Sequence, residues 1–418
     1  MGEAEEKLRP PGAELEKEAP SSPFRRRDFF LFWTAGAVDG LGTCASSLFL
    51  PLILLGAGYP AGLTGLVASV ALVSGLVVSP VAGVFADRRP RKPMMYGAAL
   101  VAAGAMGSVF VAVALGHVVL VHVLVAAVIE QAAGATYGAA ASGTIRRLVP
   151  PGEYTRAIGY LQARDQAVQI VGPTLGGALY QLARWVPLLA DAVSFLLVAV
   201  ASRAIRTDLT PEREGPAPSF TRDFAEGLRF VRAEPFLRFV VVWTAGINAL
   251  LGALYFHAVL ASHAQDASPS SIGLILTLAG VGGLLGALAA PWLVARIPAP
   301  WIVTGASWAM VPTAAGLAFA SQTWLYGLLL SAVSLTAPSV AVVLQTRAVL
   351  VTPDRLLARM GTVLGTAGQG VAALAPLAAG VLVTAYGGRA MALGCAGALA
   401  GLALYATARA GLVAREAT

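Results

Sequence analysis

The composition of this 418-residue chain is that of a membrane protein, with 57% hydrophobic residues, 12% charged residues and a mean hydropathy of +0.73. A soluble globular domain carries about twice that share of charged residues, and the apolar runs here, of about 20 residues each, are long enough to cross a bilayer as helices. The net charge of +7 does not indicate nucleic-acid binding, because Lys and Arg fall in short clusters between apolar runs, as in cytoplasmic membrane loops.

The chain begins with a segment that is neither a signal peptide nor a folded domain. Residues 1–23 are rich in Glu and Pro and contain no apolar core, so we predict a disordered cytoplasmic tail. Further along, Cys44 and Cys395 both lie inside apolar runs, which indicates neither a disulfide framework nor a cysteine-based metal site. We expect no cofactor and no bound metal.

Twelve apolar runs follow the tail, and each is predicted to be a transmembrane helix. The fold is therefore predicted to be an all-α integral membrane protein. The predicted spans are residues 28–55, 62–86, 93–115, 119–143, 158–181, 186–206, 236–261, 271–295, 300–320, 324–345, 359–384 and 388–408.

The longest connection, residues 207–235, lies between the sixth and seventh spans and divides the chain into two halves of six helices. It mixes charges of both signs with proline, and we interpret it as a cytoplasmic linker. Its second part, FAEGLRFVRAE, is predicted to form an amphipathic helix at the membrane interface. The halves are residues 24–206 and 236–410, and residues 411–418 are predicted to be a second cytoplasmic tail.

The positions of the basic residues predict the orientation. With the N-terminus in the cytoplasm, every Lys and Arg except Arg184 and Arg389 falls in a tail, in a cytoplasmic connection or at a helix end beside one. The opposite orientation would reverse that ratio. We predict a multi-pass protein of the cell membrane with both termini in the cytoplasm, and the preference for Arg over Lys indicates a GC-rich bacterial gene.

The two halves share sequence features. WTAG at 33–36 recurs at 243–246, and a shift of 203 residues aligns further pairs in chain order. Tandem six-helix halves in the same orientation are typical of one class of secondary transporters, with the substrate site at the midplane between them. We therefore predict two pseudo-symmetric six-helix bundles. The pairs at the shift of 203 are Gly83 with Gly286, Pro150 with Pro353, Arg156 with Arg359, and Pro173 with Pro376.

A dense charge cluster, GVFADRRPRK at 83–92, lies between the second and third spans. It resembles the signature of that loop in the major facilitator superfamily, and the resemblance extends over the chain after residue 24. The resemblance implies that Asp87 faces the N-terminal end of the eleventh span, where the helix dipole favours a carboxylate, and that this contact latches the cytoplasmic gate. Pro90 replaces the second glycine of the signature. The matching residues are Gly83, Asp87, Arg88, Arg91 and Lys92.

A second motif, GPTLGG in the fifth span, resembles the shorter half of the antiporter signature of the same family, although Val168 stands where that signature has an earlier glycine. We interpret it as a helix-bend motif formed by Gly172, Pro173, Gly176 and Gly177. The phrases LVPPGEYTRAIGY, DAVSFLL and EGLRFVRAEPFLR resemble the exporter branch that includes macrolide and siderophore efflux proteins.

Two carboxylates lie near the middle of predicted spans: Asp39 in the first and Glu130 in the fourth. Ionisable groups at this depth are costly and therefore functional candidates. Spans one and four line the central cavity in the family, so the resemblance implies that these groups exchange a proton for substrate. The alternative is that each forms only an interhelical hydrogen bond, which is our interpretation of Asp191 in span six. Many drug:proton antiporters carry Arg at the position of Glu130, so an Arg-based mechanism is not carried over.

Other polar residues in the spans are candidates for the cavity wall. Gln369, on span eleven, is predicted to face the cavity as the repeat partner of Gln166. On span seven, Asn248 and Tyr255 are candidates for substrate contact, with helix packing as the alternative. Span five carries a stripe at helical spacing that consists of Gln162, Asp165, Gln166 and Gln169.

These features predict a secondary active transporter, a proton-coupled exporter of a small amphipathic organic compound such as a drug, an antibiotic or a siderophore-like metabolite. Proton-symport uptake of a small metabolite is an alternative, because the same carboxylates would serve it. A membrane-embedded enzyme is a remote alternative and no enzymatic activity is expected, since the sequence has no P-loop and its histidines lack metal-ligand spacing. The expected partners are the substrate, the proton and the bilayer, and we expect a monomer that binds no nucleic acid.

Overall fold

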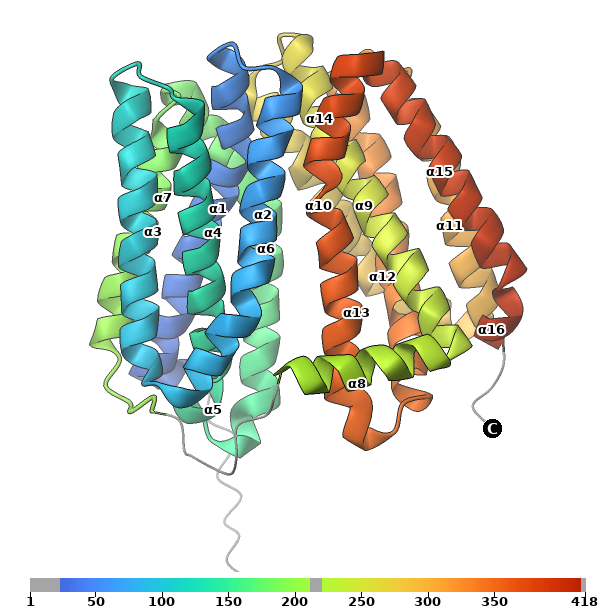
Figure 1. Ribbon diagram of the computed structural model, residues 1–418, viewed down its shortest axis with the longest axis horizontal. Coiled ribbons are helices and arrows are strands. Elements are labelled where there is room, and N and C mark those ends of the chain that lie inside the picture. The colour runs from blue at the N-terminus through green and yellow to red at the C-terminus, as the bar shows by residue number, and fades with distance from the viewer. Residues whose placement is uncertain (1–22, 211–219, 415–418) are drawn as a thin grey trace, which may run out of the picture.

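The computed structural model describes residues 23–210 and 220–414, and the described residues form helices and no strand (Figure 1). A helix occupies every range predicted as a span, so the all-α prediction is confirmed. The first six ranges hold α1 (Arg27–Gly56), α2 (Ala61–Arg88), α3 (Arg91–Ala114), α4 (Leu120–Ser142), α6 (Tyr154–Leu182) and α7 (Val186–Ala204). The others hold α9 (Pro235–Ala264), α10 (Pro269–Arg296), α11 (Ala299–Leu317), α12 (Thr323–Leu350), α13 (Leu357–Ala372), α14 (Ala375–Tyr386) and α15 (Gly388–Ala408).

Short helices complete the described chain. The predicted N-terminal tail lies outside the described residues up to residue 22, as do residues 211–219 of the predicted linker and residues 415–418 of the last tail. The short elements are α5 (Ile145–Leu148), α8 (Phe220–Ala233), α16 (Ala410–Ala414) and the 3-10 helices η1 (Pro23–Arg25), η2 (Pro151–Glu153) and η3 (Asp354–Leu356).

Among the described residues, 10 helices are long and apolar enough to cross a membrane, with α13 and α14 counted together as Arg359–Tyr386. Two helices in predicted span positions, α6 and α11, are not in that group. The polar stripe of α6 lowers its mean hydropathy, and the Trp, Thr, Ser and Pro residues of α11 lower that of α11. Both pack against helices that are in the group, α6 against α1 and α10, and α11 against α12 and α15.

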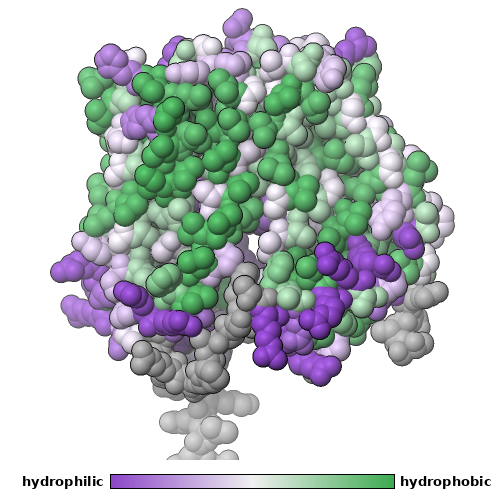
Figure 2. Space-filling view, in the orientation of Figure 1, coloured by the Kyte–Doolittle hydropathy of each residue, from purple (hydrophilic) through white to green (hydrophobic). Residues whose placement is uncertain are grey.

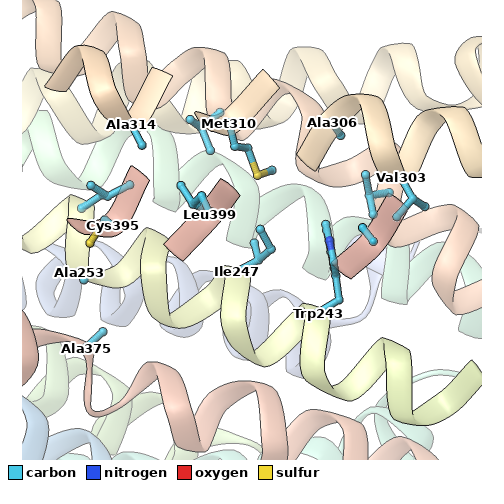
Figure 3. Packing of buried hydrophobic residues seen from close by; sticks show 14 of the residues in the cluster. Trp243, Ile247, Ala253, Val303, Ala306, Met310, Ala314, Ala375, Cys395 and Leu399 are labelled. Carbon is cyan, nitrogen blue, oxygen red and sulfur yellow. The ribbon is translucent and has the colours of Figure 1, made fainter. Parts of the chain in front are cut away.

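The helices form two groups that lie side by side (Figure 1): the first contains α1–α7 and the second contains α9–α16. Figure 3 shows part of the largest buried cluster, where Ile247 of α9, Met310 of α11 and Leu399 of α15 meet. The first group has its own clusters, one of them around Met106 and Leu188. In lipid, close packing of this kind holds helices together, because the lipid tails are as apolar as the side chains.

The second part of the linker is a helix, as predicted. On α8, Val231 is buried, and Leu228 packs against the core of the second group. Gly227 lies against the backbone carbonyl of Arg359 on α13, and the Arg359 guanidinium forms an ion pair with Glu226. The apolar face of α8 is therefore used, at least in part, for packing against α9 and α13, whereas the sequence predicted a membrane-facing role.

Two ends of the molecule can be distinguished. The α8 end is the end where α1 begins, α2 ends and α8 lies, and the opposite end is the far end (Figure 1). Figure 2 shows hydrophilic residues gathered at the α8 end, with a broad hydrophobic belt beside them. This distribution matches the clustering of Lys and Arg that the sequence shows between alternate spans.

The two groups meet near the far end along a first seam, between α2 and α14. Gly65 packs against the Pro376 carbonyl, so that a Cβ at residue 65 would lie 2.8 Å from the carbonyl carbon. One turn along α2, the Ser69 hydroxyl accepts a hydrogen bond from the Leu377 N–H at 2.9 Å. The backbones touch here because glycine has no side chain to hold them apart.

A second seam joins α10 and α6 in the same manner. Gly273 packs against the Pro173 carbonyl, where a Cβ at residue 273 would lie 2.9 Å from the carbonyl carbon. The hydroxyl oxygens of Thr277 and Thr174 are 2.7 Å apart, and Thr277 also donates to the Ile170 carbonyl at 2.7 Å. Each seam thus combines a glycine from the second predicted span of one group with a proline carbonyl from the fifth predicted span of the other.

The internal repeat of the sequence relates the two seams. Pro173 and Pro376 are a pair that the shift of 203 predicts (376 − 173 = 203), and the seam glycines are separated by 208 residues (273 − 65 = 208). The 3-10 helices η2 and η3 follow the aligned prolines Pro150 and Pro353. The contact surface between the groups is therefore pseudo-symmetric, which is the arrangement that the repeat predicts.

The aligned prolines have different effects on their helices. α6 continues as a single helix through Pro173, so the predicted helix-bend motif interrupts no helix there. Its glycines serve close packing, with Gly172 against Cys44 and Gly176 against Ala45. By contrast, Pro376 is the second residue of α14, just after the break that separates α14 from α13. A proline cannot donate the backbone hydrogen bond and its ring crowds the preceding turn, which explains a break at this point.

Candidate functional site

A cavity of about 730 Å³ lies between α13 and the first group of helices, and we call it the main cavity. Its α2 wall extends from Leu72 to Pro80, which places it on the α8 side of the seams. Cavities of about 300–1,000 Å³ accommodate small organic ligands. The polar residues that line it are Asp39 and Thr43 of α1, Ser79 of α2, Glu130 and Gln131 of α4, and Thr362, Thr366 and Gln369 of α13.

Asp39 lines the main cavity from α1, and its Oδ1 atom is buried without a hydrogen-bond partner in the described structure. The Arg164 guanidinium lies against Gly36, about one turn before Asp39, so Gly36 makes room for a cation near this carboxylate. Arg164 is already paired with Asp165, with Nη2 and Oδ1 2.7 Å apart. Asp39 therefore has a cation nearby but shares it with a second carboxylate.

Glu130 of α4 is only 8% exposed and lines the main cavity. Within residues 23–210 and 220–414 its side chain forms no hydrogen bond and no ion pair. A buried charge without a partner is costly, by several kcal/mol after the protein relaxes. Glu130 consequently needs a bound proton or a cationic ligand, and either one can reach it through the cavity that it lines.

A third carboxyl group, Asp191 of α7, lies behind the cavity wall. It is fully buried, and its Oδ1 accepts a hydrogen bond from the Thr43 hydroxyl at 3.4 Å. Because Thr43 lines the main cavity, Asp191 holds a wall residue in place and is not itself among the lining residues. The interhelical hydrogen bond expected from the sequence is present.

The other predicted cavity residues are more dispersed. Gln369 is on the cavity wall, whereas the α6 stripe, in which Gln162, Asp165 and Gln169 are exposed and Gln166 is half-buried, is not part of the lining. On α9, Asn248 lies against Gly368 of α13, and the Tyr255 hydroxyl is 2.8 Å from Ser334 Oγ of α12. Tyr255 thus connects two helices of the second group.

Sequence reasoning missed the threonines of α13. Thr362, Thr366 and Gln369 follow an i, i+4, i+7 pattern and share a helix face that lines the main cavity. Helical spacing from Gln369 would have identified them.

The residues of the charge cluster at 83–92 divide into two sets. Arg91 donates to the Gly143 carbonyl at 2.9 Å, and Lys92 donates to the Ile205 carbonyl, so both join the start of α3 to neighbouring helix ends. Gly83 has open space beside it, and Asp87 and Arg88 are exposed. In the described part of the chain Asp87 forms no hydrogen bond or ion pair, so its expected contact with the start of span eleven is not made in this arrangement.

Comparison with known proteins gives concordant results. The sequence model of the Major Facilitator Superfamily matches residues 32–265. Macrolide efflux protein A of Streptococcus pyogenes is 24% identical over 207 residues, 49% of this chain and 51% of the relative. Multi-drug resistance efflux pump PmrA of Streptococcus pneumoniae is 28% identical over 185 residues, 43% of this chain and 45% of the relative. The chain thus matches about half the length of these relatives.

A solved structure shows the same fold over nearly the whole chain. It is that of a bacterial homolog of the human lysosomal transporter Spinster in an inward-facing, unoccupied conformation. The TM-score is 0.67 at 16% sequence identity, with 94% of this chain and 96% of that chain covered. At this identity the likeness concerns the fold alone.

Proposed function

The chain belongs to the major facilitator superfamily, and on that premise we propose that this membrane transporter is a proton-coupled exporter of small amphipathic organic compounds. The observation that carries the proposal is the position of Asp39 and Glu130 on the wall of one cavity, where Glu130 has no hydrogen-bond or ion-pair partner among the described residues. The likeness to macrolide and multidrug efflux proteins supports export over uptake.

In this proposal the α8 end faces the cytoplasm of a bacterial cell. The hydrophilic, Arg-rich character of the α8 end supports this orientation, because basic residues accumulate on the cytoplasmic side. The main cavity then receives substrate from the cytoplasm, and the two seams close the external side. Opening the seams and closing the α8 end moves the cavity to the other side of the membrane.

The carboxyl groups of Glu130 and Asp39 couple the export of substrate to the import of protons. Either a proton or a cationic group on the substrate can neutralise Glu130. Because the carboxyl group is single and buried, binding of one excludes binding of the other. Substrate that enters from the cytoplasm displaces the proton, and a proton that enters from outside displaces the substrate. Asp39, on the same wall, either binds and releases a proton itself or contributes negative electrostatic potential where Glu130 binds one.

Reconstitution of the full chain in liposomes tests the proposal. With protein in the inside-out orientation, an acidic lumen is expected to drive accumulation of compounds from a panel of macrolides, lipophilic dyes and siderophore-like chelators. Collapse of the gradient with nigericin should abolish it. Accumulation that requires an alkaline lumen instead would indicate symport, and the absence of gradient-driven flux for every compound would contradict proton coupling.

Asp87→Asn is expected to slow transport about five- to tenfold and to leave substrate binding unchanged. In the closed state of the α8 end, the carboxylate would meet the positive end of the α13 dipole, an interaction of about 0.3–2 kcal/mol. Initial rates in liposomes and equilibrium binding in detergent separate the two effects. Arg89→Gln is the matched control, since Arg89 is an exposed residue that follows directly on the last turn of α2, where Asp87 lies. Weakened binding in Asp87→Asn would argue against a gating role.

A further inference from the structure

A second, smaller cavity adjoins the main one. It has a volume of about 140 Å³, lies entirely among helices α1, α2 and α4 of the first group, and is here called the side pocket. Leu72, Glu130 and Gln131 line both cavities, so the two spaces adjoin at these residues. Most of the side-pocket wall is apolar, including Leu50, Pro51, Val67, Ala68, Ala71 and Ala127.

The charged residues that line the two cavities favour a positively charged ligand. Among the described residues, those that line the two cavities include the carboxyl groups of Asp39 and Glu130 and no Lys, Arg or His. Arg164, the cation beside α1, is paired with Asp165 and is not part of either wall. A ligand anion would meet like charge here, whereas a cation would satisfy the carboxyl group of Glu130, which has no partner within residues 23–210 and 220–414.

The size and polarity of the side pocket select the group that enters it. Its volume is close to that of an engineered apolar protein cavity of about 150 Å³ that stays dry and binds benzene. Apart from Ser47, Thr64, Glu130 and Gln131, the wall consists of Leu, Val, Ala and Pro, which offer dispersion contacts and no side-chain hydrogen bonds, so an apolar group gains more there than water does. A phenyl ring or a branched alkyl group of similar size is the matching occupant.

We propose that the side pocket is a binding subsite for the aromatic or branched alkyl group of an organic monocation whose charged centre lies against Glu130. Because Glu130 lines both cavities, the charge and the apolar group lie close together in such a ligand, and the rest of the molecule occupies the main cavity. The proposal names the substrate class of the proposed function and rests on that function only for its role in transport, since binding is measurable without a gradient.

Binding of tritiated tetraphenylphosphonium to the purified full-length protein in detergent tests the side pocket. Ala68→Phe places a ring inside it and is expected to weaken binding at least about tenfold, since the new side chain occupies the space in which the ligand would bury its apolar group. Val70→Phe is the matched control, because Val70 is 37% exposed on the same helix and lines neither cavity. Glu130→Gln is expected to weaken binding about tenfold or more through loss of the charge.

Competition on the unmodified protein provides a second measurement that does not depend on whether a variant folds. Tetraethylammonium keeps the charge without aryl groups, and triphenylphosphine oxide keeps aryl groups without the charge. Both are expected to displace the probe at least about tenfold more weakly than unlabelled tetraphenylphosphonium. Equal potency of tetraethylammonium would overturn the apolar subsite, and equal potency of triphenylphosphine oxide would overturn the role of Glu130.

The outcomes also separate this inference from the proposed function. If a pH gradient drives some compound across the membrane but tetraphenylphosphonium does not bind, the subsite is wrong and proton-coupled export stands. If the probe binds and Ala68→Phe weakens it, but no gradient drives transport of any compound, the subsite stands and the proposed function is wrong. Equal binding by Ala68→Phe and Val70→Phe would also overturn the subsite.

Discussion

Replacing Gly65 and Gly273 together by alanine is expected to open the far end of the molecule. Each new Cβ would lie within 3 Å of a carbonyl carbon on the other group of helices, the Pro376 carbonyl in one seam and the Pro173 carbonyl in the other. Backbone atoms in a packed helix cannot move aside as a flexible side chain can, so each substitution is expected to cost the closed state about 1–3 kcal/mol. Each 1.4 kcal/mol changes the population ratio about tenfold.

Double electron–electron resonance measures this opening. Spin labels on cysteines at His117 and Ser321, both exposed at far-end connections of different groups, report the separation in a background without Cys44 and Cys395. The distance distribution of the double variant should shift to longer values. Gly104→Ala is the control, because a Cβ at residue 104 on α3 would meet no atom of the described residues within 4 Å. A lower melting temperature with unchanged distances would contradict the seam as the conformational barrier.

Most of the fold could be predicted from the sequence because the bilayer restricts the possibilities. Apolar length fixes the span positions, and a helix is found at all of them, even at α11, which is short and contains Pro312. The repeat predicted that Pro173 and Pro376 are equivalent, and both present a carbonyl to a glycine of the other group. The break after α13 was not predictable, since Pro173 in the equivalent position leaves α6 intact.

The candidate site was predicted only in part. Asp39, Glu130 and Gln369 line one cavity, because charged or amide groups at membrane depth are costly and must face a polar space or a partner. The polar stripe of α6 obeys the same periodicity but does not line the main cavity, since periodicity fixes a helix face and leaves its neighbour undefined. The side pocket gave no sequence signal, because its Leu, Val and Ala residues resemble ordinary helix-packing positions.

Helix α2 connects the side pocket directly to the first seam. α2 contributes Gly65 and Ser69 to the first seam and Leu72 to both cavities, all within eight residues. An occupant of the side pocket therefore touches the same stretch of helix that seals the far end. Occupancy can then change the stability of the seam through direct packing, without a long chain of intermediates.

Glu130→Gln is expected to abolish pH-gradient-driven export while exchange of substrate across the membrane continues. Glutamine keeps the shape of a protonated glutamate but releases no proton, and Glu130 has no protein partner among the described residues whose loss would complicate the result. Asp39→Asn tests the second carboxylate of the cavity wall in the same way. We expect gradient-driven accumulation in liposomes to fall at least about a hundredfold for Glu130→Gln, as for removal of a required acid–base group.

The third carboxyl group supplies the matched control. Asp191 is as deeply buried as Glu130, yet it lies behind the wall and accepts a hydrogen bond from Thr43. Asp191→Asn should therefore lower the free energy of unfolding by about 1–3 kcal/mol, because the new amide would be buried with an incomplete set of hydrogen bonds. Gradient-driven transport should remain measurable. Loss of coupling in Asp191→Asn together with its retention in Glu130→Gln would transfer the proton-carrying role to α7. That result would place coupling behind the cavity wall, out of direct contact with the substrate.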